Sequence, residues 1–182
     1  MPILTDGFRK EHEFPDLYVP IELEINLTKN HKMFDFCPNR EDYLNWIPFE
    51  FRFQIGDNES YIYPKEFGAT FSLEELKRWI KNLEELFVKI AKREQLSGED
   101  YYKDRGTVEF YALETYFILE FSDETGGIIG TTVWIEMGLI PIPGEEGGLR
   151  RGFRFTIDLK DLKKFTSELK KQLDTIVGEW NI

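Results

Sequence analysis

The chain has 182 residues, a formal charge of -11 at pH 7 and a pI near 4.8. Its length fits one domain, and a composition with 41% hydrophobic residues and 16 Phe supplies a packed core. The negative charge repels phosphate, which argues against nucleic acid and anionic membranes as partners and favours cations or a basic protein. The alternative is that the negative charge only keeps the protein soluble, as it does in many cytoplasmic proteins.

Cys37 is the only cysteine, so no internal disulfide can form and we expect a buried, unreactive thiol. No apolar run is long enough for a membrane helix. Residues 1–16 are charged, lack the apolar run of a signal peptide and are interpreted as a loosely held N-terminal arm. The chain is therefore predicted to be cytoplasmic, with residues 1–182 forming a single α+β domain.

The first half of the chain has strand patterns. Apolar and polar residues alternate over residues 19–27 and again over 46–55, as in half-buried strands. Residues 29–43 contain Pro, Asn and several charges and are predicted to form an irregular loop. Residues 56–60 have the composition of a turn, after which 61–63 can pair back as a short strand.

A helix is predicted to begin at Ser72. Ser72 and Glu75 fit a capping box, and Phe71 and Leu76 occupy the positions of a hydrophobic staple. Apolar residues then recur with the helical period of 3.6 residues, so one face of the helix is buried. The helix should end before Gly98.

The second half of the chain returns to strands. Strands are predicted over residues 107–112 and 115–121, and a hairpin connection at 122–127 leads to a third strand at 128–137. A final short strand at 153–157 follows a loop rich in Pro and Gly. These runs of successive strands favour antiparallel pairing over a parallel sheet.

A second helix is predicted to begin at Asp158 and to stop at Gly178. Its buried stripe comprises Leu162, Phe165, Leu169, Leu173 and Ile176. The predicted fold is α+β, an antiparallel sheet of about six strands with both amphipathic helices packed on one face.

The residues with catalytic potential do not form a recognisable set. The two histidines, His12 and His31, lie in charged, irregular segments, so neither a zinc site nor a histidine-based triad is expected. The glycines of residues 126–130 precede a strand and lack the Lys-Ser/Thr ending of a phosphate loop. The sequence thus predicts a protein that is not an enzyme and holds no cofactor or metal.

Carboxylates are abundant at polar strand positions. Glu22 and Glu24 share one face of a strand, where a divalent cation could bind, although a solvated face explains them more simply. The other such positions are Glu109, Glu114, Glu120 and Glu136. An acid pair among them would need cross-strand distances that sequence does not supply.

Several segments together resemble the WapI family of bacterial immunity proteins, over about residues 19–177. They are Asn45-Trp46 opening a strand, the helix start at 71–79, the strand at 108–114, and residues 153–159 before the last amphipathic helix. The arm at 1–16 and the loop at 29–43 are longer than the family pattern.

The resemblance implies a small cytoplasmic protein that binds and neutralises a polymorphic toxin, often a nuclease, without catalysis. An acidic inhibitor can be steered to the basic surface of such a toxin. The predicted contact residues are acidic positions in loops and at strand ends: Asp57, Glu59, Asp123, Glu124, Glu145 and Glu146. The alternative is an intracellular scaffold or oligomeric subunit without catalysis, and a homo-oligomer is compatible with either function.

Overall fold

The computed structural model describes residues 1–5, 19–57, 59–63, 69–96, 105–111, 117–124, 126–139 and 148–178. Within these ranges the chain forms nine strands, two α-helices and one short 3-10 helix. In chain order they are β1 (Ile3–Thr5), β2 (Ile21–Leu27), η3 (Asp42–Leu44), β3 (Trp46–Ile55), β4 (Glu59–Tyr63), β5 (Ala69–Ser72), α1 (Leu73–Arg93), β6 (Thr107–Tyr111), β7 (Phe117–Asp123), β8 (Ile128–Leu139), β9 (Gly148–Asp158) and α2 (Leu159–Val177).

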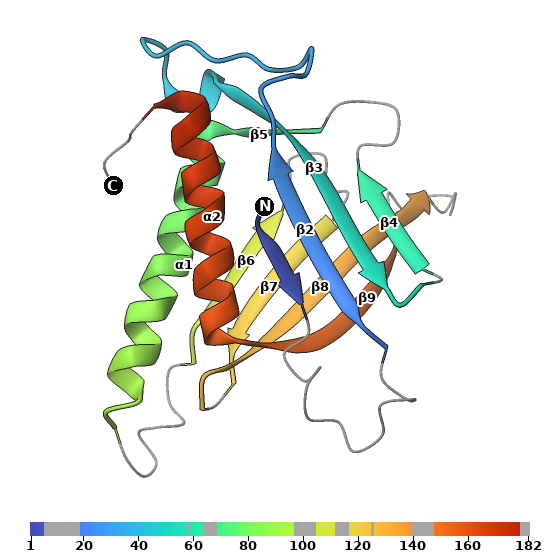
Figure 1. Ribbon diagram of the computed structural model, residues 1–182, viewed down its shortest axis with the longest axis vertical. Coiled ribbons are helices and arrows are strands. Elements are labelled where there is room, and N and C mark those ends of the chain that lie inside the picture. Colours follow the sequence, from blue (N-terminus) through green and yellow to red (C-terminus); the bar gives the residue numbers. More distant parts are fainter. Residues whose placement is uncertain are drawn as a thin grey trace, which may run out of the picture.

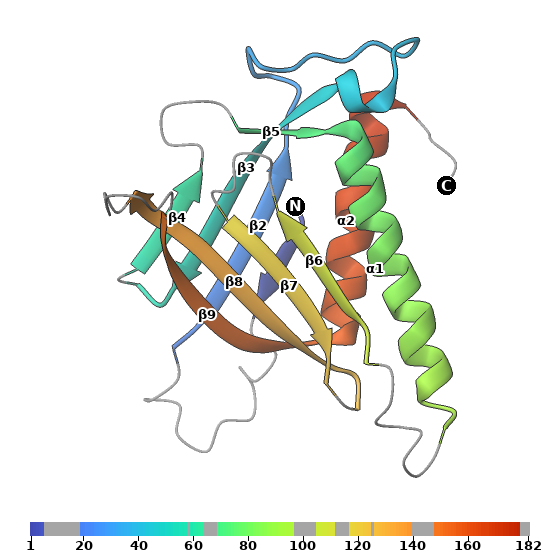
Figure 2. The ribbon, with the colours of Figure 1, turned by 180° about the vertical axis from the view of Figure 1, so that it is seen from behind.

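The described strands form two antiparallel sheets. Sheet A has the order β1-β2-β3-β4, with β5 paired to the first part of β3, and sheet B has the order β6-β7-β8-β9. The sheets face each other with crossing strands (Figures 1 and 2). They approach closely where β4 meets β8 and β9, since Tyr61 lies against Phe153 and the Tyr63 hydroxyl donates to the carbonyl of Glu136 at 3.0 Å.

The space between the sheets is filled by aromatic rings. Strands with a two-residue period place alternate side chains inward, and those of β3 and β7 meet across the interface. Phe51 of β3 stacks on Phe117 of β7 with ring centroids 4.0 Å apart. The ring centroids of Phe53 and of Phe155 in β9 are 6.1 Å apart. Both sheets and both helices thus contribute to one hydrophobic core.

The two helices lie side by side along the opening between the sheets, on the side away from β4 (Figure 1). Trp79 of α1 is almost completely buried. Its ring stacks on Phe110 of β6 with centroids 3.9 Å apart, and its centroid is 6.1 Å from that of Phe165 in α2. The Ser72 and Glu75 capping box forms as predicted. Each helix therefore closes the core with its apolar stripe and leaves its other side in water.

The predicted α+β class, the antiparallel pairing and the two amphipathic helices are confirmed. The number and arrangement of strands differ from the prediction, because the strands divide into two facing sheets and the helices contact both. Alternation shows which side chains face inward but not which strand is the partner. The four-residue strand β5 is too short for alternation to reveal it.

The expectation of a loosely held arm does not hold for Ile3–Thr5, which pairs with β2 as the edge strand of sheet A. Leu4 is completely buried, because it lies opposite Leu23 on the inner face. The remainder of the predicted arm, residues 6–16, lies outside the described part of the chain. Three residues carry too little pattern to be recognised as a strand.

Leu4→Ala should lower the free energy of unfolding by about 2–5 kcal/mol, because it leaves a cavity beneath β1. The neighbouring Ile3 is the matched control, since its side chain is 36% exposed, and Ile3→Ala should cost less than about 1 kcal/mol. Urea denaturation measures both. Equal, small losses would contradict the docking of the N-terminal strand.

Candidate functional site

The acidic residues predicted to contact a partner are divided between the two sheets. Asp57 is exposed in the turn after β3, and Glu59 begins β4. Asp123 and Glu124 lie at the end of β7 in sheet B. Glu145 and Glu146 lie outside the described residues. The prediction therefore does not define one continuous surface.

Asp123 is a correction to the predicted contact set. Its side chain is 3% exposed and forms an ion pair with Arg93, which is 5% exposed at the end of α1. Asp123 continues the inward alternation of β7 by one step, which is why it is buried. Its carboxylate ties α1 to sheet B and is not available to a partner.

Glu59 and Glu124 are partly buried and already have cationic partners. Glu59 pairs with Arg151 of β9, which joins the two sheets. Glu124 accepts a hydrogen bond from Arg154 at 2.6 Å. Burial raises the pKa of the Tyr61 hydroxyl above its ordinary value, and a hydrogen bond to Glu59 adds to that shift.

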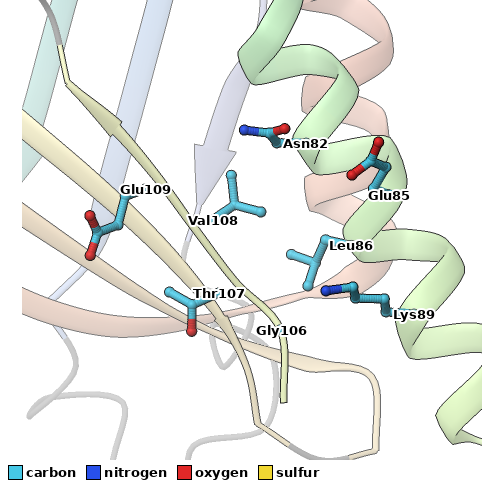
Figure 3. Close-up of a pocket in the computed structure, with 8 residues that line it drawn as sticks. All are labelled: Asn82, Glu85, Leu86, Lys89, Gly106, Thr107, Val108 and Glu109. Carbon is cyan, nitrogen blue, oxygen red and sulfur yellow. The ribbon is translucent and has the colours of Figure 1, made fainter. Parts of the chain in front are cut away.

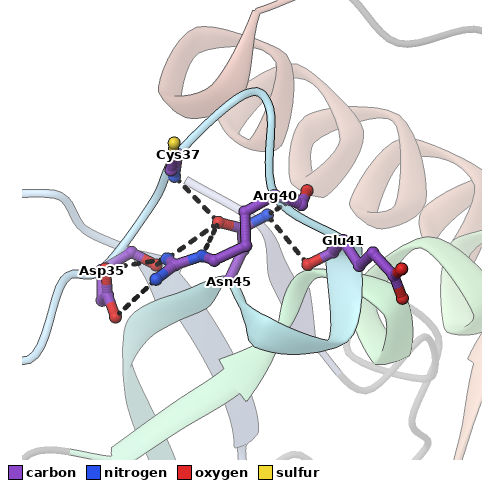
Figure 4. Close-up of polar contacts among 5 residues, drawn as sticks. All are labelled: Asp35, Cys37, Arg40, Glu41 and Asn45. Atoms are coloured by element: carbon purple, nitrogen blue, oxygen red, sulfur yellow. Dashed lines mark hydrogen bonds and ion pairs between the residues drawn. The ribbon is translucent and has the colours of Figure 1, made fainter.

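A network around Asn45 holds the long loop that precedes β3 (Figure 4). Asn45 is 1% exposed, and its Oδ1 accepts hydrogen bonds from the Cys37 N–H at 2.8 Å and from Arg40 Nη2 at 3.0 Å. Its Nδ2 donates to the carbonyls of Arg40 and Glu41, both at 3.3 Å. One buried amide thus fixes a loop that has little regular structure.

The same network sets the charge and exposure of its neighbours. The hydrogen bond from Arg40 lowers the pKa of the Asp35 carboxyl below its ordinary value. Cys37 is exposed, so the expectation of a buried thiol is wrong. This segment is held through the Cys37 N–H, which donates to Asn45, and the thiol itself faces solvent.

The outer face of sheet B carries a row of apolar side chains that face solvent. Tyr111 lies opposite Ile118, Ile118 opposite Trp134, and Trp134 opposite Gly152, in one line across the four strands. Tyr111 is 53% exposed and Trp134 40%, while Ile118 is partly exposed. Exposed Tyr and Trp side chains are typical of protein interfaces, and here Ile118 lies between the two.

The next row contains two carboxylates in opposite positions. Glu109 of β6 lies directly across from Glu120 of β7. The Asp123 N–H donates to the Gly106 carbonyl at 3.0 Å, so by alternation Glu109 and Glu120 form a non-hydrogen-bonded pair, the kind with the closer side chains. Like charges placed directly opposite one another destabilise a sheet.

Neither member of this pair makes an ion pair or side-chain hydrogen bond with another residue in the described ranges. Arg154, in the same row, is separated from Glu120 by Thr132 and pairs with Glu124 instead. The polar strand positions of Glu109 and Glu120 were evident from the alternation of the sequence. Their juxtaposition depends on strand register, which the sequence did not supply.

A shallow groove separates β6 from α1 (Figure 3). Its volume is about 200 Å³, with Asn82, Glu85 and Lys89 along the helix. Figure 3 shows Glu109 directed away from the helix, toward the outer face of sheet B. A second hollow of about 250 Å³ adjoins it along the same two elements, and Asn82 and Glu109 line both. Each is smaller than the roughly 300–1,000 Å³ usual for small-molecule sites.

The described residues contain no cluster of three or more His, Cys, Asp or Glu side chains that could hold a metal ion. Glu22 and Glu24 of β2 lie opposite Gln54 and Arg52, respectively, which fits the solvated strand face. Neither α1 nor α2, as described, has the length and apolar character that crossing a bilayer requires.

Asn45→Ala should lower the free energy of unfolding by about 2 kcal/mol, because it removes the partner of the Cys37 N–H and of the Arg40 carbonyl and one of the two partners of the Glu41 carbonyl. Asn30→Ala, in the exposed part of the same loop, should change it by less than about 0.5 kcal/mol. Urea denaturation gives both values, and faster amide exchange at Cys37 should accompany the first. Similar losses in both variants would contradict the role of Asn45.

The segments that resemble an immunity protein have defined places in this fold. Asn45 organises the loop before β3, and Ser72 caps α1. The sequence profile of the Immunity protein WapI-like family matches residues 20–176, from the start of β2 into the last turn of α2. Comparison with curated proteins finds no match. Because the match covers both helices and both sheets, the chain belongs to the Immunity protein WapI-like family.

Proposed function

We propose that this protein binds and neutralises a bacterial protein toxin, and that it acts by binding alone. The observation that carries this proposal is the family match over residues 20–176, since the family is one of immunity proteins. A basic toxin is the expected partner because the chain has a formal charge of -11. A nuclease fits that description, as enzymes that handle phosphates present basic surfaces.

The surface of the described residues supports binding better than catalysis. Exposed aromatic side chains lie in a row on sheet B, next to the Glu109 and Glu120 pair. Each of the two hollows beside α1, of about 200 and 250 Å³, is smaller than a usual small-molecule site. Asp57, in an exposed turn of sheet A, remains a secondary candidate for a rim contact.

Co-expression with the toxin encoded beside its gene tests the proposal. Cells producing the toxin should survive only when this protein is present, and a catalytically inactive toxin should form a complex with it at micromolar concentration or below. The affinity should fall as salt is raised from 50 to about 500 mM, because the charges that attract the partners become screened. An unrelated acidic protein of similar size serves as the control.

Failure of this protein to protect the cells, together with the absence of a complex at micromolar concentration, would overturn the proposed function. Protection without a complex would overturn neutralisation by direct binding.

A further inference from the structure

We propose that the outer face of sheet B is the toxin-binding surface and that it receives a basic side chain, arginine above lysine, between Glu109 and Glu120. The surface, called here the β6–β8 face, comprises Glu109, Tyr111, Ile118, Glu120 and Trp134. This inference rests on the proposed function and adds to it the location of the contact and the chemistry of its partner.

The fold itself leaves the apolar row uncovered. Phe110, Leu119 and Val133 point into the core, so their neighbours Tyr111, Ile118 and Trp134 must point outward. A one-residue shift that buried the row would expose the core. The exposure of these apolar side chains is therefore fixed by the register of three strands.

Trp134 is held in place before any partner arrives. It lies opposite Gly152 of β9, where an added Cβ would come within 2.5 Å of the indole ring. The ring therefore lies close to the Gly152 backbone, in space that the Cβ of any other residue would enter. A side chain that is already ordered loses less conformational entropy on binding, which is a property of interface hot spots.

The carboxylate pair specifies the charge of the partner. Glu109 and Glu120 are opposite one another, carry like charge and have no cationic partner among the described residues. A guanidinium placed between them would convert their repulsion into two charge-assisted hydrogen bonds, and its flat face could stack on Tyr111. The apolar row would then pack against the residues that flank the basic side chain.

The outer face of sheet A lacks this combination. There Glu24 lies opposite Arg52, so opposite charges face each other across β2 and β3. Ile62 is 51% exposed and Glu50 is exposed, but Ile62 lies opposite Arg52 and Glu50 opposite Asn26. These two residues provide controls of the same chemical type on the other sheet.

The decisive variant is Glu120→Lys, because it should affect stability and binding in opposite directions. The new lysine faces Glu109 and forms a cross-strand ion pair, which should raise the melting temperature by roughly 1–4 °C. It also fills the position proposed for the toxin's basic side chain. Affinity for the inactive toxin encoded beside the gene, measured by calorimetry, should fall at least about thirtyfold.

Two further variants separate the parts of the surface. Trp134→Ala should weaken binding by about thirtyfold or more, and Glu109→Gln combined with Glu120→Gln by at least about tenfold. Ile62→Ala and Glu50→Gln should leave affinity within about twofold of the unsubstituted chain. Circular dichroism and melting curves confirm that each variant is folded.

The outcomes distinguish this inference from the proposed function. If the unsubstituted chain binds the toxin and Glu120→Lys binds equally well, the β6–β8 face is not the contact and the proposed function stands. If the unsubstituted chain neither binds nor protects, both fall. If Trp134→Ala alters self-association in sedimentation experiments but not toxin affinity, the face joins two copies of this chain and the inference is overturned.

Discussion

The aromatic layer between the two sheets is the constraint on which the rest of the structure depends. Phe51 and Phe117 stack across the interface, and Trp79 extends the layer to the helices. Once alternate residues of β6, β7 and β8 are committed to this layer, the residues between them must face water. Tyr111 and Trp134 are thus exposed as a consequence of the same packing that stabilises the protein.

The helices complete the core and determine which faces stay free. They occupy the opening between the sheets, so the outer surfaces of both sheets are left without a helical cover (Figures 1 and 2). The buried pair of Arg93 and Asp123 fixes the end of α1 against β7. This arrangement presents a broad sheet surface on a rigid base, which favours binding to another protein with little rearrangement.

Local patterns predicted the elements well. Alternation located β2, β3 and β8, and capping chemistry located the start of α1 at Ser72. Relations between strands could not be predicted, because alternation carries no information about register or partners. The division into two sheets and the position of Glu109 opposite Glu120 therefore came only from the structure.

The incorrect predictions have specific physical causes. Asp123 was assigned to a turn by its composition, although continuing the alternation of β7 by one residue would have placed it inside. Cys37 was expected to be buried because free thiols usually are, whereas the loop is held by its backbone. In both cases the prediction followed the usual behaviour of the residue type, whereas the local backbone geometry decides the position of the side chain.

Cross-saturation NMR on the labelled chain bound to unlabelled, inactive toxin tests the central claim most directly. If the β6–β8 face is the contact, saturation should transfer most strongly to the amides of residues 109–111 and 118–120 and to the Trp134 indole N–H. Transfer confined to β2–β4, or to the loop held by Asn45, would contradict the account.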